Sequence, residues 1–114
     1  MRIEYRKLVR DRIPEIVRRD GSLCEAETMA EEAYHQALRE KLVEEACEAA
    51  GADAGHLMTE LADVYEVIDA LLASSHIAYE AVRAEQERRR AERGGFGQRV
   101  CLLWTSEGPI DEPA

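Results

Sequence analysis

The chain has 114 residues, a length that suits one domain with a modest core. Hydrophobic residues make up 46% and charged residues 34% of the chain, a composition typical of a globular protein. The net charge of −9 argues against a protein that binds nucleic acid or an anionic membrane through bulk charge. Aromatic residues are only 5% of the chain, which disfavours an all-β fold.

The charge is unevenly distributed along the chain. Residues 25–69 contain thirteen acids and two bases, a local net charge of −11. Residues 2–19 contain seven bases and three acids, and residues 80–99 contain six bases and four acids. The sequence therefore has an acidic centre between two basic flanks.

The beginning of the chain and the cysteines indicate a cellular location. No apolar stretch typical of a secretory signal follows Met1, and no run of apolar residues is long enough to span a membrane. Cys24, Cys47 and Cys101 are odd in number and show no C-x-x-C spacing, which favours reduced thiols. We therefore expect a soluble, cytoplasmic protein.

Two helices are expected in the first half of the chain. Pro14 suits the first turn of a helix and Gly21 suits its end, which predicts a short helix over residues 12–19. Thr28, followed three residues later by a glutamate, has the pattern of a capping box. It predicts a long helix that begins there and ends near Gly51.

The second half of the chain predicts two further helices. One helical pattern covers residues 56–73, and Ser75 is available as the N-cap of the next helix. That last helix is expected over residues 77–93, before Gly94 and Gly95.

The predicted fold is all-α, a bundle of four to five helices with a short C-terminal extended segment. Residues 99–104 are too few for a helix and read as a strand or an extended segment. Residues 1–104 are expected to form one domain, and residues 105–114 a disordered tail. Because the helices are long for so small a chain, we expect another subunit to complete the bundle.

The first long helix places acidic residues on or near its apolar face. With each residue advancing by about 100° around the helix, Glu45 falls within about 40° of Leu38 and Ala49. Glu48 falls on the edge of this apolar face, and Glu44 lies mostly outside it. An ionised carboxylate that faces a core requires a compensating cation.

The second long helix repeats this arrangement. Glu60 falls within about 40° of Val64 and Leu71, and Asp63 lies at the edge of the same face. If the two helices pack antiparallel through their apolar faces, four carboxylates converge. Such oxygen ligands suit Mg²⁺ or Mn²⁺ better than zinc. The alternative is that these acid pairs lie on ordinary solvated faces.

Three motifs together resemble a known family. The segments 44–48 (EEACE) and 60–63 (ELAD) match the E-E-x-x-E and E-x-x-D pattern of the MazG-like all-α nucleoside triphosphate pyrophosphohydrolases. The segment 7–14 (KLVRDRIP) and the segment 93–96 (RGGF) resemble a small single-domain branch of this family, described as phosphoribosyl-ATP pyrophosphohydrolase-like.

This resemblance implies an activity and a metal site. The family hydrolyses a nucleoside triphosphate between its α and β phosphates in a Mg²⁺-dependent reaction, which yields the monophosphate and pyrophosphate. By resemblance, the metal ligands are Glu45, Glu48, Glu60 and Asp63, with Mn²⁺ as a substitute for Mg²⁺. Glu44 and Glu45 are expected to be catalytic, Glu44 from a second shell or by orienting the attacking water. The resemblance also implies a homodimer or a dimer of dimers.

Basic residues are expected to bind the phosphates of the substrate. Lys41 lies on the same side of its helix as Glu48, and it is interpreted either as a phosphate contact or as a salt-bridge partner of the neighbouring acids. Lys7, Arg10 and Arg93 are further candidates for substrate binding. Arg83 and residues 88–90 are expected to form a charged, solvated helix surface.

Two other functions stay open from the sequence. The chain could be a non-catalytic helical module of the same fold that binds a nucleotide or a protein partner. It could also be an enzyme acting on phosphoribosyl-ATP, which shares the chemistry, although the residues give no independent support for that substrate.

Overall fold

The computed structural model describes residues 1–106, and within them it contains helices and no strand. The four helices are α1 (Ile13–Arg19), α2 (Glu31–Gly51), α3 (Leu57–Ser74) and α4 (Tyr79–Arg93). The all-α prediction is confirmed. The chain divides into two units, Met1–Ala81 and Val82–Ala114, which are described separately here. The single domain expected over residues 1–104 stays a prediction.

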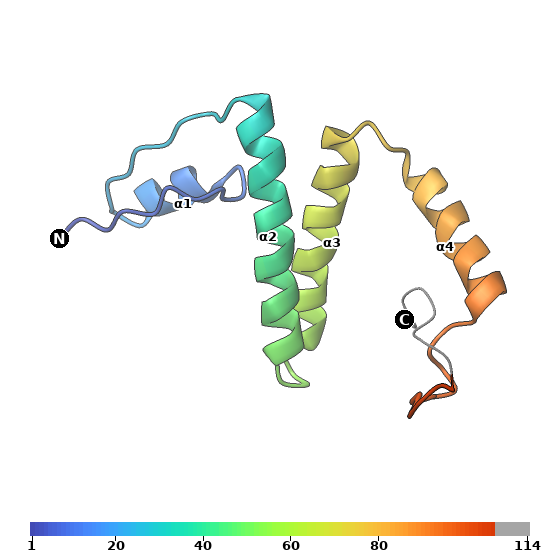
Figure 1. The fold of residues 1–114 in the computed structure, drawn as a ribbon. Helices are drawn as coiled ribbons and strands as arrows, with labels where there is room; N and C mark the ends of the chain where they lie inside the picture. The colour runs from blue at the N-terminus through green and yellow to red at the C-terminus, as the bar shows by residue number, and fades with distance from the viewer. Residues whose placement is uncertain (107–114) are drawn as a thin grey trace. The chain divides into compact units, whose positions relative to one another are not determined.

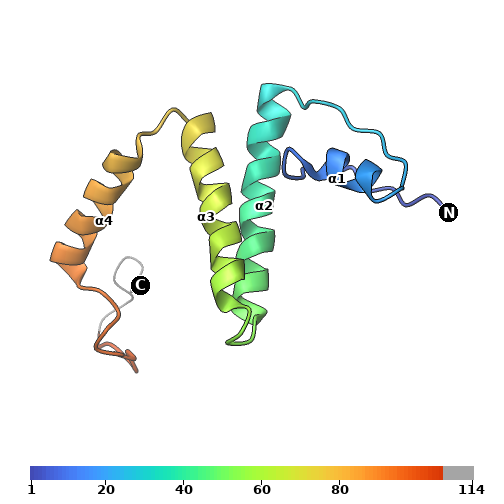
Figure 2. The same cartoon turned by 180° about the vertical axis from the view of Figure 1, so that it is seen from behind.

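Helices α2 and α3 form an antiparallel hairpin that is the centre of the first unit (Figure 1). The view from behind shows the same two helices side by side along their length (Figure 2). A short turn connects them, in which the carboxylate of Asp53 accepts a hydrogen bond of 3.0 Å from the backbone N–H of His56. The same N–H also donates to the backbone carbonyl of Asp53 at 3.1 Å, so both acceptors of Asp53 hold the turn before α3.

The interface of the hairpin contains few fully buried side chains. Among the described residues, the buried hydrophobic ones are Leu38 and Ala49 of α2 and Val67 of α3. Glu45 is buried on the same face of α2, as the helical periodicity predicts. The core is therefore small, and a carboxylate occupies part of it.

The start of α2 differs from the predicted capping box. The helix begins at Glu31 with Ala30 as the N-cap residue, and no side chain caps it. Thr28 lies two residues before that cap, so the prediction that it opens the helix is wrong. The physical reason is that Ala30 has extended backbone angles while its carbonyl already accepts the N–H of Tyr34. Glu31 and Glu32 complement the positive end of the helix dipole.

The end of α3 is a Schellman motif, so the prediction of Ser75 as an N-cap is also wrong. Ser75 is the C-cap of α3, and His76 follows it in the left-handed conformation with φ 56°. The N–H of Ile77 donates to the carbonyl of Leu72 at 3.0 Å, and the N–H of His76 donates to that of Ala73 at 3.3 Å. These bonds satisfy carbonyls of the last turn of α3, and the next helix, α4, begins only at Tyr79.

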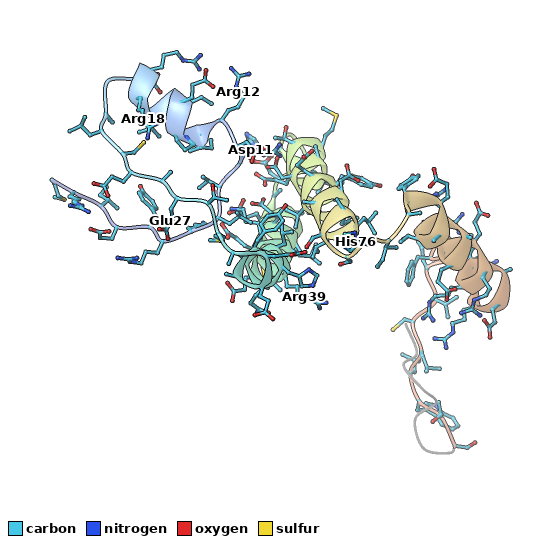
Figure 3. The ribbon with its side chains drawn as sticks, turned by 90° about the horizontal axis from the view of Figure 1, so that it is seen from above. Asp11, Arg12, Arg18, Glu27, Arg39 and His76 are labelled. Atoms are coloured by element: carbon cyan, nitrogen blue, oxygen red, sulfur yellow. The ribbon has the colours of Figure 1, made fainter. Side chains whose placement is uncertain are left out.

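A histidine connects the open end of the hairpin. The Nε2 atom of His35 accepts a hydrogen bond from Nε of Arg39 at 3.0 Å. Its Nδ1 atom therefore carries the proton, and this N–H donates to the hydroxyl of Ser74 at 3.0 Å. Figure 3 shows Arg39 on α2 and His76 just beyond the last turn of α3. The imidazole links α2 to the C-terminal end of α3.

Helix α1 follows its sequence signals. Pro14 stands in the first turn, and Gly21 follows the helix with φ 92°, a conformation that glycine adopts without steric cost. The helix ends at Arg19 as predicted and begins at Ile13, one residue after the predicted start.

Helix α4, most of which belongs to the second unit, has a charged surface. All residues of α4 are exposed, and Arg88 pairs with Glu85 and Glu92 on the same helix, which confirms the expected solvated surface. The helix ends at Arg93 and is followed by Gly94 with φ 83°. Residues 100–105 have no regular secondary structure, and most of the predicted tail, residues 107–114, lies outside the described residues. Within the described chain, no helix combines the length and apolar character needed to cross a membrane.

The left-handed residue after α3 predicts a stabilising substitution. Because His76 has a positive φ, His76→Gly removes backbone strain and should raise the free energy of unfolding by about 0.5–1 kcal/mol. Ser75→Gly is the matched control, because Ser75 has φ −95° and glycine there should lower stability. Urea denaturation followed by circular dichroism measures both. Equal effects of the two substitutions would contradict the prediction.

Candidate metal centre

Three carboxylates converge across the interface of α2 and α3. Glu45, Glu60 and Asp63 each contribute an oxygen, and these three oxygens lie within 4.8 Å of one another. Glu60 and Asp63 are three residues apart on α3 and therefore share a face of the helix. Glu45 approaches them from α2, on the face that also buries Leu38. The antiparallel packing therefore brings together three of the four acids that the sequence predicts as ligands.

Glu60, one member of this group, carries an unsatisfied carboxylate oxygen. Its Oε2 atom is buried and has no hydrogen-bond partner in the described part of the chain. Burial raises the pKa of the Glu60 carboxyl, and the negative charges of Glu48, Asp63 and Glu45 raise it further. A buried acceptor without a donor is costly, and a cation bound here would satisfy it.

Lys41 partly compensates the buried charge of Glu45. The side chain of Glu45 is only 11% exposed, and its Oε1 atom lies 3.6 Å from Nζ of Lys41. The same ammonium group lies 3.6 Å from Oε1 of Glu44. The salt-bridge interpretation of Lys41 is thus the one that the structure shows.

Lys7 brings a second ammonium group to Glu44. Its Nζ atom donates a hydrogen bond of 2.5 Å to Oε1 of Glu44. This bond is the main cause that lowers the pKa of Glu44 and raises the pKa of Lys7, with Lys41 lowering that of Glu44 further. Glu44 is therefore held in its ionised form.

Arg10 pairs with the third carboxylate of the group. Its Nη2 atom donates a hydrogen bond of 2.7 Å to Oδ1 of Asp63. The side chains of Arg10 and Asp63 are 57% and 35% exposed, so water screens the pair. Ion pairs with this exposure contribute about 0.2–1 kcal/mol each. The main effect of this pair is therefore to place the positive charge of Arg10 beside the carboxylates.

Two predicted site residues lie outside the group of three. Glu48 is exposed and contributes its charge to the surroundings of Glu60, without providing one of the converging oxygens. Arg93 belongs to the second unit, and its role in substrate binding stays a prediction.

The ion pairs of the N-terminal segment had no local signal in the sequence. Lys7 and Glu44 are 37 residues apart, and Arg10 and Asp63 are 53 residues apart. Helical periodicity relates residues on one helix only, so it cannot show that the first twelve residues fold back onto the hairpin. The uneven distribution of charge along the chain was the one indication that basic and acidic segments attract each other.

Comparison with known proteins does not assign the chain to a family. No protein-family model, curated protein or solved structure matches the chain.

The donor set fits a hard divalent cation. Carboxylate oxygens are the ligands that Mg²⁺ and Mn²⁺ prefer, and neither histidine nor cysteine belongs to this group of converging side chains. The unpaired Oε2 atom of Glu60 is the observation that distinguishes the group from a solvated acidic surface. The residues present therefore fit Mg²⁺ or Mn²⁺.

The raised pKa of Glu60 predicts a pH-dependent stability. Because the folded-state pKa lies above the unfolded one, stability from the protonated form is present at low pH. It is lost as the pH rises through the raised value. Without divalent metal, Glu60→Gln should therefore raise Tm by a few degrees at pH 8, and by less at pH 4. Thermal unfolding in a chelating buffer measures this difference.

Glu66→Gln is the matched control for this prediction. Glu66 lies on the same helix and is exposed. The Tm of the Glu66→Gln variant should therefore stay close to that of the unmodified protein at both pH values. A Tm that falls in Glu60→Gln, or a gain that Glu66→Gln reproduces, would contradict the assignment of unbalanced charge to Glu60.

Proposed function

We propose that the protein is a metal-dependent nucleoside triphosphate pyrophosphohydrolase that cleaves between the α and β phosphates. The observation that carries the proposal is the group formed by Glu45, Glu60 and Asp63, with a buried carboxylate oxygen that lacks a partner. The resemblance of segments 44–48 and 60–63 to the MazG-like pattern supplies the reaction. The cations around the group support an anionic substrate.

The residues of the hairpin would hold the metal. Glu45, Glu60 and Asp63 provide three oxygens from two helices, and Glu48 is proposed as a fourth ligand because its charge already acts on Glu60. Bound there, Mg²⁺ would supply charge neutralisation at phosphate oxygens and lower the pKa of a water molecule. Lys41 keeps the Glu45 carboxylate in position from one side.

Glu44 is proposed to orient the attacking water. Its carboxylate is ionised, since hydrogen bonding to Lys7 lowers its pKa, and an ionised carboxylate accepts a hydrogen bond from water. The water oxygen forms a bond to the α phosphorus, and the bond from that phosphorus to the oxygen bridging to the β phosphorus breaks. The proton of the water passes to a carboxylate or to solvent, and pyrophosphate leaves.

Three cations of the first unit are proposed to bind phosphate oxygens of the substrate. Lys7, Arg10 and Lys41 each lie within hydrogen-bond or ion-pair distance of an acid of the site. A guanidinium group binds two phosphate oxygens at once, and an ammonium group acts as a point charge. Arg93 is proposed as a further substrate contact on the resemblance of segment 93–96 alone.

The proposed activity predicts the effect of removing a ligand. With Mg²⁺ or Mn²⁺, the protein should release pyrophosphate from at least one member of a panel of canonical, oxidised and deaminated nucleoside triphosphates that also includes phosphoribosyl-ATP. Glu45→Gln and Glu60→Gln should lower kcat/KM by at least about a hundredfold, because each removes a charged metal ligand. Pyrophosphate release and the identity of the monophosphate product measure this.

Glu66→Gln is again the control, since this exposed acid of α3 lies outside the converging group, and it should leave the activity unchanged. The proposal would be overturned if no nucleotide is hydrolysed with either metal. Stabilisation by a nucleotide without turnover would then support the non-catalytic binding module.

A second copy of the chain is proposed to cover the apolar surface of α3. Leu57, Met58, Leu61 and Tyr65 form this surface with neighbouring alanines and line a shallow groove. Met58 is 81% and Tyr65 is 68% exposed. Because the hairpin buries so few hydrophobic side chains of its own, burial against an identical surface would supply stability that the single hairpin lacks.

The proposed self-association predicts the effect of a charge in the groove. Leu61→Glu should convert a dimer or tetramer into monomers and lower Tm, since the carboxylate loses hydration when the surface is covered. Light scattering coupled to size-exclusion chromatography measures the mass. Thr59→Glu is the control, because Thr59 is an exposed residue of the same helix outside the groove. A monomeric unmodified protein would contradict the proposal.

A further inference from the structure

The N-terminal segment contacts both helices of the hairpin beside the candidate metal centre. We call residues 7–10 the N-terminal strap. Lys7, at its start, is bonded to Glu44 of α2, and Arg10, at its end, is bonded to Asp63 of α3. The strap therefore connects the two helices at the level of the carboxylate group.

One apolar side chain of the strap is partly buried between these two ion pairs. Leu8 is partly buried, whereas every other residue from Met1 to Ile13 is exposed. Exposed ion pairs are weak and easily exchanged, whereas the partial burial of Leu8 contributes a stabilisation that does not depend on charge.

The two ion pairs of the strap differ in their relation to the metal centre. Asp63 belongs to the group of three converging carboxylates, whereas Glu44 does not. A cation in this group would compete with Arg10 for the carboxylate of Asp63 and would leave the pair of Lys7 and Glu44 intact. Metal binding would therefore disturb one contact of the strap and leave the other unchanged.

We propose that Arg10 pairs with Asp63 in the metal-free protein and is released from this carboxylate when the divalent cation binds. The guanidinium group then binds the phosphate oxygens of the substrate, while Lys7 and Leu8 keep the strap attached. This inference rests on the proposed function and adds an ordered exchange to it: Asp63 passes from Arg10 to the metal, and Arg10 passes from Asp63 to the phosphate.

The exchange follows from the charges at close range. A divalent cation bound by Asp63 repels a guanidinium group at the same carboxylate, and the half-exposed ion pair offers little resistance. Because Arg10 starts 2.7 Å from the carboxylate of Asp63, its guanidinium group would stay close to a metal bound there after its release. Phosphate groups bound by a metal at this site would be close to Arg10 and could accept the two parallel hydrogen bonds of its guanidinium group.

A calorimetric titration with Mn²⁺ or Mg²⁺ tests the competition. Arg10→Ala should bind the metal about two- to fivefold more tightly than the unmodified protein, the range that one solvent-exposed ion pair supports. Arg10→Lys keeps the charge and should remain near the unmodified affinity. Arg12→Ala is the matched control, because Arg12 pairs with Glu15 within its own segment. It should not change the metal affinity.

Limited trypsin digestion of the unmodified protein tests the release and does not depend on any variant folding. Mn²⁺ should accelerate cleavage after Arg10, and inorganic pyrophosphate, added with the metal in excess, should restore protection. Cleavage after Lys7 and within residues 88–90 should keep its rate, since the metal leaves those contacts unchanged. Mass spectrometry of the fragments identifies each site.

The outcomes separate this inference from the proposed function. If the metal binds but Arg10→Ala shows no gain in affinity, or cleavage after Arg10 stays constant, the exchange is overturned and the metal centre stands. If the unmodified protein binds neither Mn²⁺ nor Mg²⁺, the proposed function and the exchange both fail.

Discussion

The carboxylates of Glu45, Glu60 and Asp63 face one another across the interface of α2 and α3, where their charges repel and water is partly excluded. Packing the two helices therefore requires positive charge nearby, or protonation of an acid. Lys41 supplies that charge from within α2, and Arg10 supplies it from the N-terminal segment. The fold of the first unit depends on this balance, because the same interface that buries its core also buries its charge.

The cost of this arrangement is visible in the rest of the unit. A hairpin that places carboxylates at its interface has less room for hydrophobic side chains there, and the buried hydrophobic residues of the described chain are accordingly few. Apolar side chains such as Met58 and Tyr65 remain exposed on α3. Functional sites commonly reduce stability in this way, and the proposed second copy and the metal would each restore part of it.

The positions of the helices could be predicted to within a few residues, because periodicity and chain-breaking residues act locally. The two predicted caps failed for reasons that local patterns do not contain. Thr28 has the right residue three positions later, yet the chain enters α2 only at Ala30. Ser75 was expected to begin a helix, whereas the hydrogen bonds of a Schellman motif make it the end of one. A residue type that can cap a helix is not sufficient, because the backbone path before the helix decides whether its side chain reaches the free N–H groups.

The sequence by itself determined which acids share a helical face, since about 3.6 residues per turn places Glu45 beside Leu38 and Glu60 beside Val64 without reference to any other segment. Only the tertiary structure decided which acids meet and which cations reach them. Glu48 lies at the edge of the apolar face of α2 and is exposed. Arg10 contacts Asp63, although the two residues are 53 positions apart in the sequence. Helical geometry orients a side chain about its own axis, whereas convergence depends on how two axes pack and where the remaining chain lies.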